Sequence, residues 1–487
     1  MEYPKIIQGG MGAGVSSSGL ARAVSSLGQL GVVSGTALDV SLCRRLQLGD
    51  TNGTMRMALA AFPDQALVGR VLERYFIPGG KPEGTPFKLL PAFTQHPDLA
   101  LLELTVAANF VEVHLAKRGH PGVVGINYLE KIQFPNLASI YGAMLAGVDY
   151  VLMGAGIPRE IPAVLDTLAL RRAASLRMRV EGEREGSEHR LAFDPAVLAL
   201  TGGELKRPIF LAIVASSVLA ANLARKADGK VDGFVVEGPT AGGHNAPPRG
   251  KPELTAQGEP RYGERDKVDL AAMRALGRPF WLAGSFGRPE RLVEALGEGA
   301  QGIQAGTAFA FCQESGLTTQ VKARVFELAR QGRAPVRTSA TASPTGFPFK
   351  VVQWEESLSR EDTYRARRRI CDLGYLRTAY QKPDGSLGYR CASEPVEAYL
   401  AKGGRREDTE GRRCLCNALM SNIGLAQNQK WGYEEEPLVT AGDDLAELSA
   451  IFGNEGVYSA AQVVGYLLGV PAAPAPGQAP APVPAEV

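Results

Sequence analysis

Eight short apolar runs, each followed by a helix-like stretch, constrain the fold of this chain more than any other feature. Each run has the length of a strand and is almost continuously apolar, as expected for parallel strands that are buried on both faces. The segments between them repeat apolar residues three and four positions apart and often end in glycine, which is typical of helices. The runs are residues 5–12, 31–35, 123–128, 150–156, 209–216, 233–239, 280–285 and 302–309.

Strand alternating with helix predicts right-handed β–α–β units and a parallel sheet. Eight such repeats suit closure into a (β/α)8 barrel, the TIM barrel fold. The alternative that the same alternation permits is an open, doubly wound sheet.

The chain of 487 residues is longer than the ~250 residues of a minimal barrel, so it must carry further segments. We predict the barrel over residues 1–340, with an insertion at 38–97 after the second strand, and a mainly helical C-terminal subdomain over 341–470. The Pro/Ala-rich end, 471–487, is predicted to be disordered or polyproline-like. Residues 245–267 are long for a strand–helix connection and are predicted to form a lid or a packed surface loop.

Charge and hydropathy argue against nucleic-acid and membrane partners. The formal net charge is +2 at pH 7, and both signs are dispersed along the chain. The start, MEYPKIIQGG, lacks the charged and long apolar regions of a signal peptide. The longest apolar run, 209–224, contains polar residues and falls short of the ~20 residues that span a bilayer. We therefore expect a cytoplasmic protein.

Two glycine-rich loops predict a phosphate site. In barrels of this kind, reactive groups gather at the C-terminal ends of the strands, and the loops after strands seven and eight often hold phosphate. Here those loops pair Gly284 with Ser285 and Gly306 with Thr307. Backbone N–H groups free of side-chain obstruction form a good phosphate cradle. The alternative is that these glycines only form tight turns.

The other strand ends favour a flat cofactor with polar edges. Gly10, Met11 and Gly12 leave backbone exposed, Asn127 offers an amide, and Gly154 leaves room. An isoalloxazine ring with a phosphorylated chain would use all of these features. A separate dinucleotide-binding domain is not predicted, because no convincing glycine motif stands at Rossmann spacing.

A histidine stands directly beyond the sixth strand. His244 follows Gly242 and Gly243, so its imidazole is expected at the barrel mouth on a chain that can lie close to a ligand. Histidine can take a proton from a carbon acid or stabilise a developing negative charge near neutral pH. We predict His244 as the catalytic residue and the two glycines as part of the cofactor site. The alternative is a histidine that only makes structural hydrogen bonds.

Four of the six cysteines fall in the C-terminal region, at Cys371, Cys391, Cys414 and Cys416. Four thiols are enough for a zinc or an iron–sulfur site. Their spacing, C-x19-C-x22-C-x-C, lacks the paired C-x2-C knuckles of typical zinc sites. Buried free thiols in a reducing compartment are the favoured interpretation, so no metal site is predicted.

Four motifs taken together resemble the nitronate monooxygenase family, formerly called 2-nitropropane dioxygenases. They are IIQGGMGAGVSSSGLARAVSSLGQLG, GVDYVLMGAGIP, VASSVLAANLARKADGKVDGFVVEGPTAGGHN and PFWLAGSFGRPERLVEALGEGAQGIQAGTAF. The resemblance covers roughly residues 4–350, and the same superfamily includes flavin-dependent enoyl-acyl-carrier-protein reductases. It implies a barrel that binds FMN without covalent attachment, with His244 near the flavin.

The chain departs from the compact members of this family in three places. The AGGH histidine is followed by NAPPRG and an extended loop, and Ser285 replaces the usual second glycine of its motif. The C-terminal region is absent from compact enzymes, so the resemblance implies the cofactor more firmly than the substrate or the electron donor. This region has three candidate roles: it could close the active site, form a homodimer interface or dock a carrier protein.

The resemblance implies two reactions of small-molecule substrates. As a nitronate monooxygenase, the protein would oxidise an alkyl nitronate with O2 to a carbonyl compound and nitrite, and His244 would take the α-proton of a neutral nitroalkane or hold the nitronate. The alternative is an NAD(P)H-dependent enoyl-acyl-carrier-protein reductase acting in trans. A flavin-binding scaffold without turnover is a third interpretation, and the intact histidine argues against it.

Overall fold

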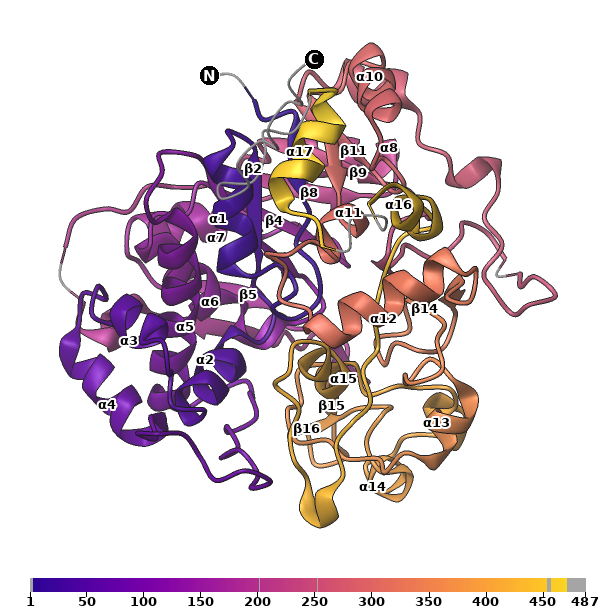
Figure 1. Cartoon of the computed structure of the whole chain (residues 1–487). Helices are drawn as coiled ribbons and strands as arrows, with labels where there is room; N and C mark the ends of the chain where they lie inside the picture. Colours follow the sequence, from indigo (N-terminus) through magenta and orange to yellow (C-terminus); the bar gives the residue numbers. More distant parts are fainter. Residues whose placement is uncertain (1–2, 201, 252, 453–456, 471–487) are drawn as a thin grey trace, which may run out of the picture.

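The computed structural model describes residues 3–200, 202–251, 253–452 and 457–470, so the predicted tail at 471–487 lies outside the described residues. Eight parallel strands close into a barrel in the order β1-β12-β11-β9-β8-β4-β3-β2 (Figure 1). The strands are β1 (Ile6–Gln8), β2 (Leu30–Ser34), β3 (Val124–Leu129), β4 (Tyr150–Gly154), β8 (Ile209–Val214), β9 (Gly233–Glu237), β11 (Phe280–Ala283) and β12 (Gly302–Ala305). Each overlaps one predicted run. The (β/α)8 prediction is confirmed, and the open-sheet alternative is wrong.

The barrel interior is filled by side chains rather than open. Branched and aromatic residues of six barrel strands form one buried cluster, with Ile7, Leu152, Val235 and Trp281 among its members. The Trp281 indole donates a hydrogen bond of 2.8 Å to the carbonyl of Pro4, which precedes the first strand. This packing leaves the C-terminal ends of the strands as the place for a site.

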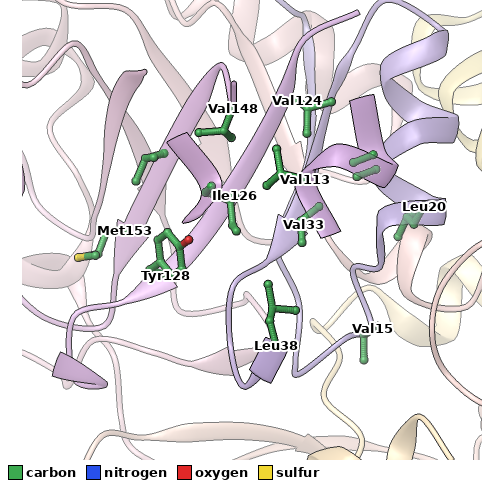
Figure 2. Close-up of a cluster of buried hydrophobic side chains, with 14 of the residues drawn as sticks. Val15, Leu20, Val33, Leu38, Val113, Val124, Ile126, Tyr128, Val148 and Met153 are labelled. Atoms are coloured by element: carbon green, nitrogen blue, oxygen red, sulfur yellow. The ribbon is translucent and has the colours of Figure 1, made fainter. Parts of the chain in front are cut away.

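Helices surround the barrel. They include α1 (Ser18–Ser26), α5 (Leu99–Lys117), α6 (Gln133–Leu145), α7 (Ile161–Ala169), α8 (Ser217–Lys226), α9 (Leu270–Ala275) and α10 (Pro289–Gly297). Figure 2 shows the outer core, where Val33 and Ile126 of the strands lie beside Leu20 of α1 and Val113 of α5. Helix α5 has the length and apolar composition of a membrane span, but 78% of its apolar window is buried inside the protein, as in a core helix.

The last helix of the chain completes the outer ring. Helix α17 (Ala460–Leu468) packs against α1 and α10, which follow the first and seventh strands (Figure 1). The short α11 (Thr307–Ala310) directly follows the eighth strand, and α12 (Thr319–Arg330) then leads the chain into the C-terminal region. A segment more than a hundred residues beyond the eighth strand therefore belongs to the packing of the barrel.

Two further segments interrupt the barrel repeat. The insertion after β2 forms α2 (Leu38–Gln47), α3 (Thr54–Leu59) and α4 (Gln65–Tyr75), which pack against α5. The second segment was not predicted: after α7, β5 (Ala174–Arg177) and β7 (Arg190–Phe193) form an antiparallel pair, with β6 (Val180–Glu181) between them in sequence. Charged residues crowd this stretch and hide the alternation on which strand prediction depends.

The C-terminal region contains strands beside its helices. Its elements are β13 (Val336–Ser339), β14 (Phe349–Val352), α13 (Glu361–Ala366), β15 (Thr378–Gln381), β16 (Leu387–Arg390), α14 (Val396–Ala401), α15 (Leu415–Asn422) and α16 (Leu445–Phe452). Strand β14 pairs with β10 (Gly243–His244) of a barrel loop, and β15 pairs with β6. The region is therefore joined to the barrel through shared sheets, and the boundary at residue 340 remains a prediction.

The loop over residues 245–267 is attached to the protein at several points. The backbone N–H of Thr338 donates to the Glu259 carboxylate at 2.7 Å, and the Arg249 guanidinium donates to the carbonyl of Ala215 at 2.9 Å. These contacts favour the packed surface loop over the mobile lid for the described part of this segment.

Candidate functional site

A cavity of about 210 Å³ lies at the C-terminal ends of the barrel strands. Its wall combines loops of the barrel with residues of the C-terminal region. All the predicted site residues line it: Gly10, Met11, Gly12, Asn127, Gly154, Gly242, Gly243, His244, Gly284, Ser285, Gly306 and Thr307. The structure thus brings together residues that are spread over almost 300 positions of sequence, while their roles as ligands stay predictions.

The loops after β11 and β12 have the backbone of an anion cradle. Gly284 and Ser285 both have left-handed backbone angles, with φ of 95° and 53°. A Cβ on Gly284 would stand 2.9 Å from the Thr240 hydroxyl, so only glycine fits there. The Ser285 hydroxyl is buried and has no hydrogen-bond partner among the described residues. Successive N–H groups in such a turn, with a free hydroxyl, suit a phosphate.

Two amide side chains in the wall lack partners for their oxygens. Asn127 Oδ1 at β3 and Gln304 Oε1 at β12 are buried and accept no hydrogen bond from the described part of the chain. An unsatisfied buried polar atom costs about 1–3 kcal/mol, so these amides indicate a bound group with polar edges. Gly10 lets the loop after β1 lie close to the Asn127 side chain, since a Cβ on Gly10 would stand 2.3 Å from the Cβ of Asn127. Gln304 was not predicted from the sequence, although a polar residue within an apolar strand is a usable signal.

His244 is held in a fixed position by the C-terminal region. It pairs with Phe349 across the β10–β14 ladder, and the two rings lie 4.6 Å apart. Its Nε2 shares a hydrogen bond of 2.7 Å with the Ser343 hydroxyl. Burial, with a smaller effect from the Lys131 ammonium, lowers the pKa of His244 to about 4. The imidazole is therefore neutral at neutral pH and able to accept a proton.

A second titratable group lines the same cavity. Glu237 is the last residue of β9, and burial raises the pKa of its carboxyl to about 7. This carboxyl can give or take a proton near neutral pH, as catalytic carboxyls do. Glu237 was not predicted as a site residue, because a single glutamate at the end of an apolar run is more often a solvated strand end.

The C-terminal region forms the roof of the cavity. Apolar side chains from the segments 373–376 and 415–419 face the barrel mouth, together with the Tyr375 ring. The Tyr375 hydroxyl donates a short hydrogen bond to the buried carboxylate of Asp39 in the insertion after β2. Of the three roles expected for this region, closing the active site is the one that these contacts support.

One more C-terminal segment reaches the phosphate loops. The backbone N–H of Gly442 donates to the Thr307 hydroxyl at 2.9 Å, and Asp443 forms an ion pair of 2.5 Å with Lys350. Asp444 also lines the cavity, and its Oδ1 has no partner in the described ranges. No local pattern in the sequence pointed to this segment.

Known proteins resemble parts of this chain. Residues 202–338, which include β8 to β12 of the barrel and His244, match the family model described as nitronate monooxygenase. Over 157 residues the chain is 31% identical to the (3aS,4S,5R,7aS)-5-hydroxy-7a-methyl-1-oxo-octahydro-1H-indene-4-carboxyl-CoA dehydrogenase of Mycobacterium tuberculosis. That match covers 32% of this chain and 39% of the dehydrogenase.

Solved structures also align with most of this chain. FabK from Thermotoga maritima is 14% identical, with 96% of this chain and 92% of that chain covered at a TM-score of 0.46. Nitroalkane oxidase from Streptomyces ansochromogenes is 15% identical, with 96% and 95% covered at a TM-score of 0.42. The enoyl reductase domain of MlnA from Bacillus amyloliquefaciens is 12% identical, with 96% and 94% covered at a TM-score of 0.45.

Proposed function

We propose that this protein binds FMN in the main cavity and oxidises alkyl nitronates, because residues 202–338 match the nitronate monooxygenase family model and the cavity fits a flavin. The products would be a carbonyl compound and nitrite, with O2 as the oxidant. The main support is one observation: buried polar atoms of Asn127, Gln304 and Ser285 lie around one cavity and have no hydrogen-bond partner within the described ranges.

The cavity wall fits the parts of FMN. The cradle of Gly284 and Ser285 would hold the phosphate, with the loop that carries Thr307 beside it. The amides of Asn127 and Gln304 would bind the polar edge of the ring. When bound, FMN supplies the electron-transfer chemistry, and the protein supplies position and charge stabilisation.

His244 would accept the proton of the substrate. Its pKa of about 4 keeps the ring neutral, so it can take the α-proton of a nitroalkane or donate a hydrogen bond to an anionic nitronate. The Ser343 hydroxyl bonds to Nε2 and so fixes the orientation of the ring. Since Nδ1 has no hydrogen bond within the described residues, it is the atom that we assign to the substrate.

The test is anaerobic mixing of the purified protein with propyl nitronate and, separately, with NADH and NADPH, followed by flavin absorbance. Bleaching by nitronate but not by the nicotinamides, with nitrite formed when air is admitted, is the expected result. A protein that neither carries nor binds FMN would refute the proposal as a whole.

The variant His244→Asn should affect the two forms of the substrate, the neutral nitroalkane and the preformed nitronate, to different extents. The variant should lose about 10²- to 10⁴-fold in kcat/KM for neutral nitroalkane, the usual contribution of a general base, and much less for the preformed nitronate. His96→Asn is the matched control, because His96 is exposed in the loop before α5. Equal losses for both substrate forms would contradict the role of proton acceptor.

One observation favours a second candidate, the NAD(P)H-dependent enoyl thioester reductase. The Mycobacterium tuberculosis relative is named as a dehydrogenase of a CoA compound, so a thioester is a substrate to consider for this chain. Flavin bleaching by NADPH, followed by reoxidation with an enoyl thioester, would replace the nitronate proposal by this one.

A further inference from the structure

A carboxylate of the C-terminal region reaches both loops of the proposed phosphate site. Asp444 stands directly before α16 and lines the main cavity. A Cβ on Gly287, in the loop after β11, would lie 3.1 Å from Asp444 Oδ2. A Cβ on Gly442 would lie 2.9 Å from Asp444 Oδ1 and 3.1 Å from the Thr307 hydroxyl, which belongs to the loop after β12. The Asp444 carboxylate therefore lies where these two loops meet.

The segment that carries Asp444 is held against the barrel. The backbone N–H of Asp443 donates to the carbonyl of Thr240 at 3.0 Å. Gly242 lets the two chains touch, because a Cβ there would lie 2.6 Å from the carbonyl carbon of Ala441. Helix α16 packs against α11 and α12. The barrel itself thus fixes the position of the carboxylate.

One oxygen of this carboxylate has no donor. An aspartate directly before a helix often caps it by accepting N–H groups of the first turn. The Oδ1 atom of Asp444 is buried and accepts no hydrogen bond from the part of the chain that the structure describes. A buried charged oxygen without a donor is costly. A ligand in the cavity that donates to Oδ1 would remove this cost.

The chemistry of the carboxylate selects the kind of group that it binds. An ionised carboxylate accepts hydrogen bonds and cannot donate them, so its partner must be a donor. An ionised phosphate offers no donor and would be repelled. The proposed function assigns the cradle of Gly284 and Ser285 to the phosphate of FMN, and the amides of Asn127 and Gln304 to the ring. The hydroxyl groups of the ribityl chain, which joins ring to phosphate, are the donors that remain.

We propose that Asp444 binds the ribityl hydroxyl groups of FMN, so that the C-terminal region supplies part of the cofactor site. The inference rests on the proposed function for the identity of the cofactor and is independent of nitronate as the substrate. It gives the C-terminal region a second role beside roofing the cavity.

The experiment titrates the full chain, freed of flavin, with three flavins and follows their fluorescence. FMN is compared with riboflavin, which lacks the phosphate, and with lumiflavin, which has the ring without the ribityl chain. Asp444→Ala should weaken FMN and riboflavin equally, by about 10- to 100-fold, the usual effect of a hydrogen bond to a charged group. Lumiflavin should bind as it does to the wild type. Asp444→Asn keeps an acceptor oxygen and should show a smaller loss of the same pattern.

Glu447→Ala is the matched control. Glu447 also belongs to α16, but it forms an ion pair with Arg288 at the surface and lies outside the cavity lining. This variant should bind all three flavins like the wild type. Unchanged binding of FMN and riboflavin to Asp444→Ala, or an equal loss for lumiflavin, would overturn the proposal. Tighter binding of FMN alone would overturn it too, because the carboxylate would then face the phosphate.

Thermal unfolding of the flavin-free protein separates binding from a structural role. Asp444→Ala should not lower the melting temperature, since Oδ1 has no partner to lose within the described residues. A clear decrease, without a difference between the flavins, would show that the carboxylate supports α16 and would overturn the proposal. A wild type that binds none of the flavins refutes the proposed function together with this inference. A wild type that binds FMN, with Asp444→Ala unchanged, refutes this inference alone.

Discussion

Acidification should destabilise this protein through His244. The pKa of the folded state is about 4, against 6.5 for a free histidine. Between these pH values His244 is protonated in the unfolded chain but neutral in the folded protein. The free energy of unfolding therefore falls as pH drops from 6.5 to 4, and His244 makes no further change to it below pH 4. The difference corresponds to at most about 3 kcal/mol, since each pKa unit is worth about 1.36 kcal/mol.

Urea unfolding at pH 7 and pH 4 measures this contribution. His244→Asn removes the titrating ring, so its stability should change less between the two pH values than that of the wild type, by about 2–3 kcal/mol. His96→Asn should keep the wild-type dependence, because His96 is exposed. The reasoning is refuted if His244→Asn and the wild type lose the same free energy on acidification.

Three further changes have defined outcomes. Gly10→Ala should abolish FMN binding in a titration followed by fluorescence, because the new Cβ would lie 2.3 Å from the Cβ of Asn127. The control is Gly69→Ala in α4: its new Cβ would meet nothing within 4 Å, and the change should raise the free energy of unfolding by up to about 1 kcal/mol. The pKa of Glu237 is raised to about 7, so the wild type should lose stability as pH rises from 4.5 to 7. Glu237→Gln should remove that loss when urea unfolding is measured at pH 5 and pH 8. An unchanged loss would contradict the burial of the Glu237 carboxyl. Glu435→Gln should lower the free energy of unfolding by about 3–5 kcal/mol in a thermal measurement, because it leaves the almost fully buried guanidinium of Arg367 without its ion-pair partner. A loss of less than about 1 kcal/mol would mean that water reaches the pair.

Most of the barrel could be read from the sequence because its signals are local. A parallel strand covered on both faces needs an apolar run, so the runs over 209–216 and 233–239 were visible without any tertiary information. The residues of the strand-end loops could also be placed, since every parallel strand of a closed barrel ends at the same face. The pair β5–β7 was missed, because its strands are only four residues long and lie in a stretch dominated by charge.

The residues of the site also fall into two groups, those that the sequence could place and those that only the fold brings to the cavity. Gly284, Ser285 and His244 follow barrel strands directly, so their place at the mouth follows from the order of strands. The Ser343 partner of His244 lies 99 positions further along the chain, and Asp444 lies beyond that. Nothing in local composition links such residues, because their contact depends on how the C-terminal region folds back over the barrel.

The sequence by itself determined the strands, the face on which the site lies and the residue types at the strand ends, since periodicity and glycine placement act over a few neighbouring positions. Only the tertiary structure decided how the C-terminal region roofs the cavity, how α17 closes the outer ring and how four cysteines meet around one small space. Long-range packing depends on the combined shape and burial of many side chains, and no single stretch of sequence carries that information.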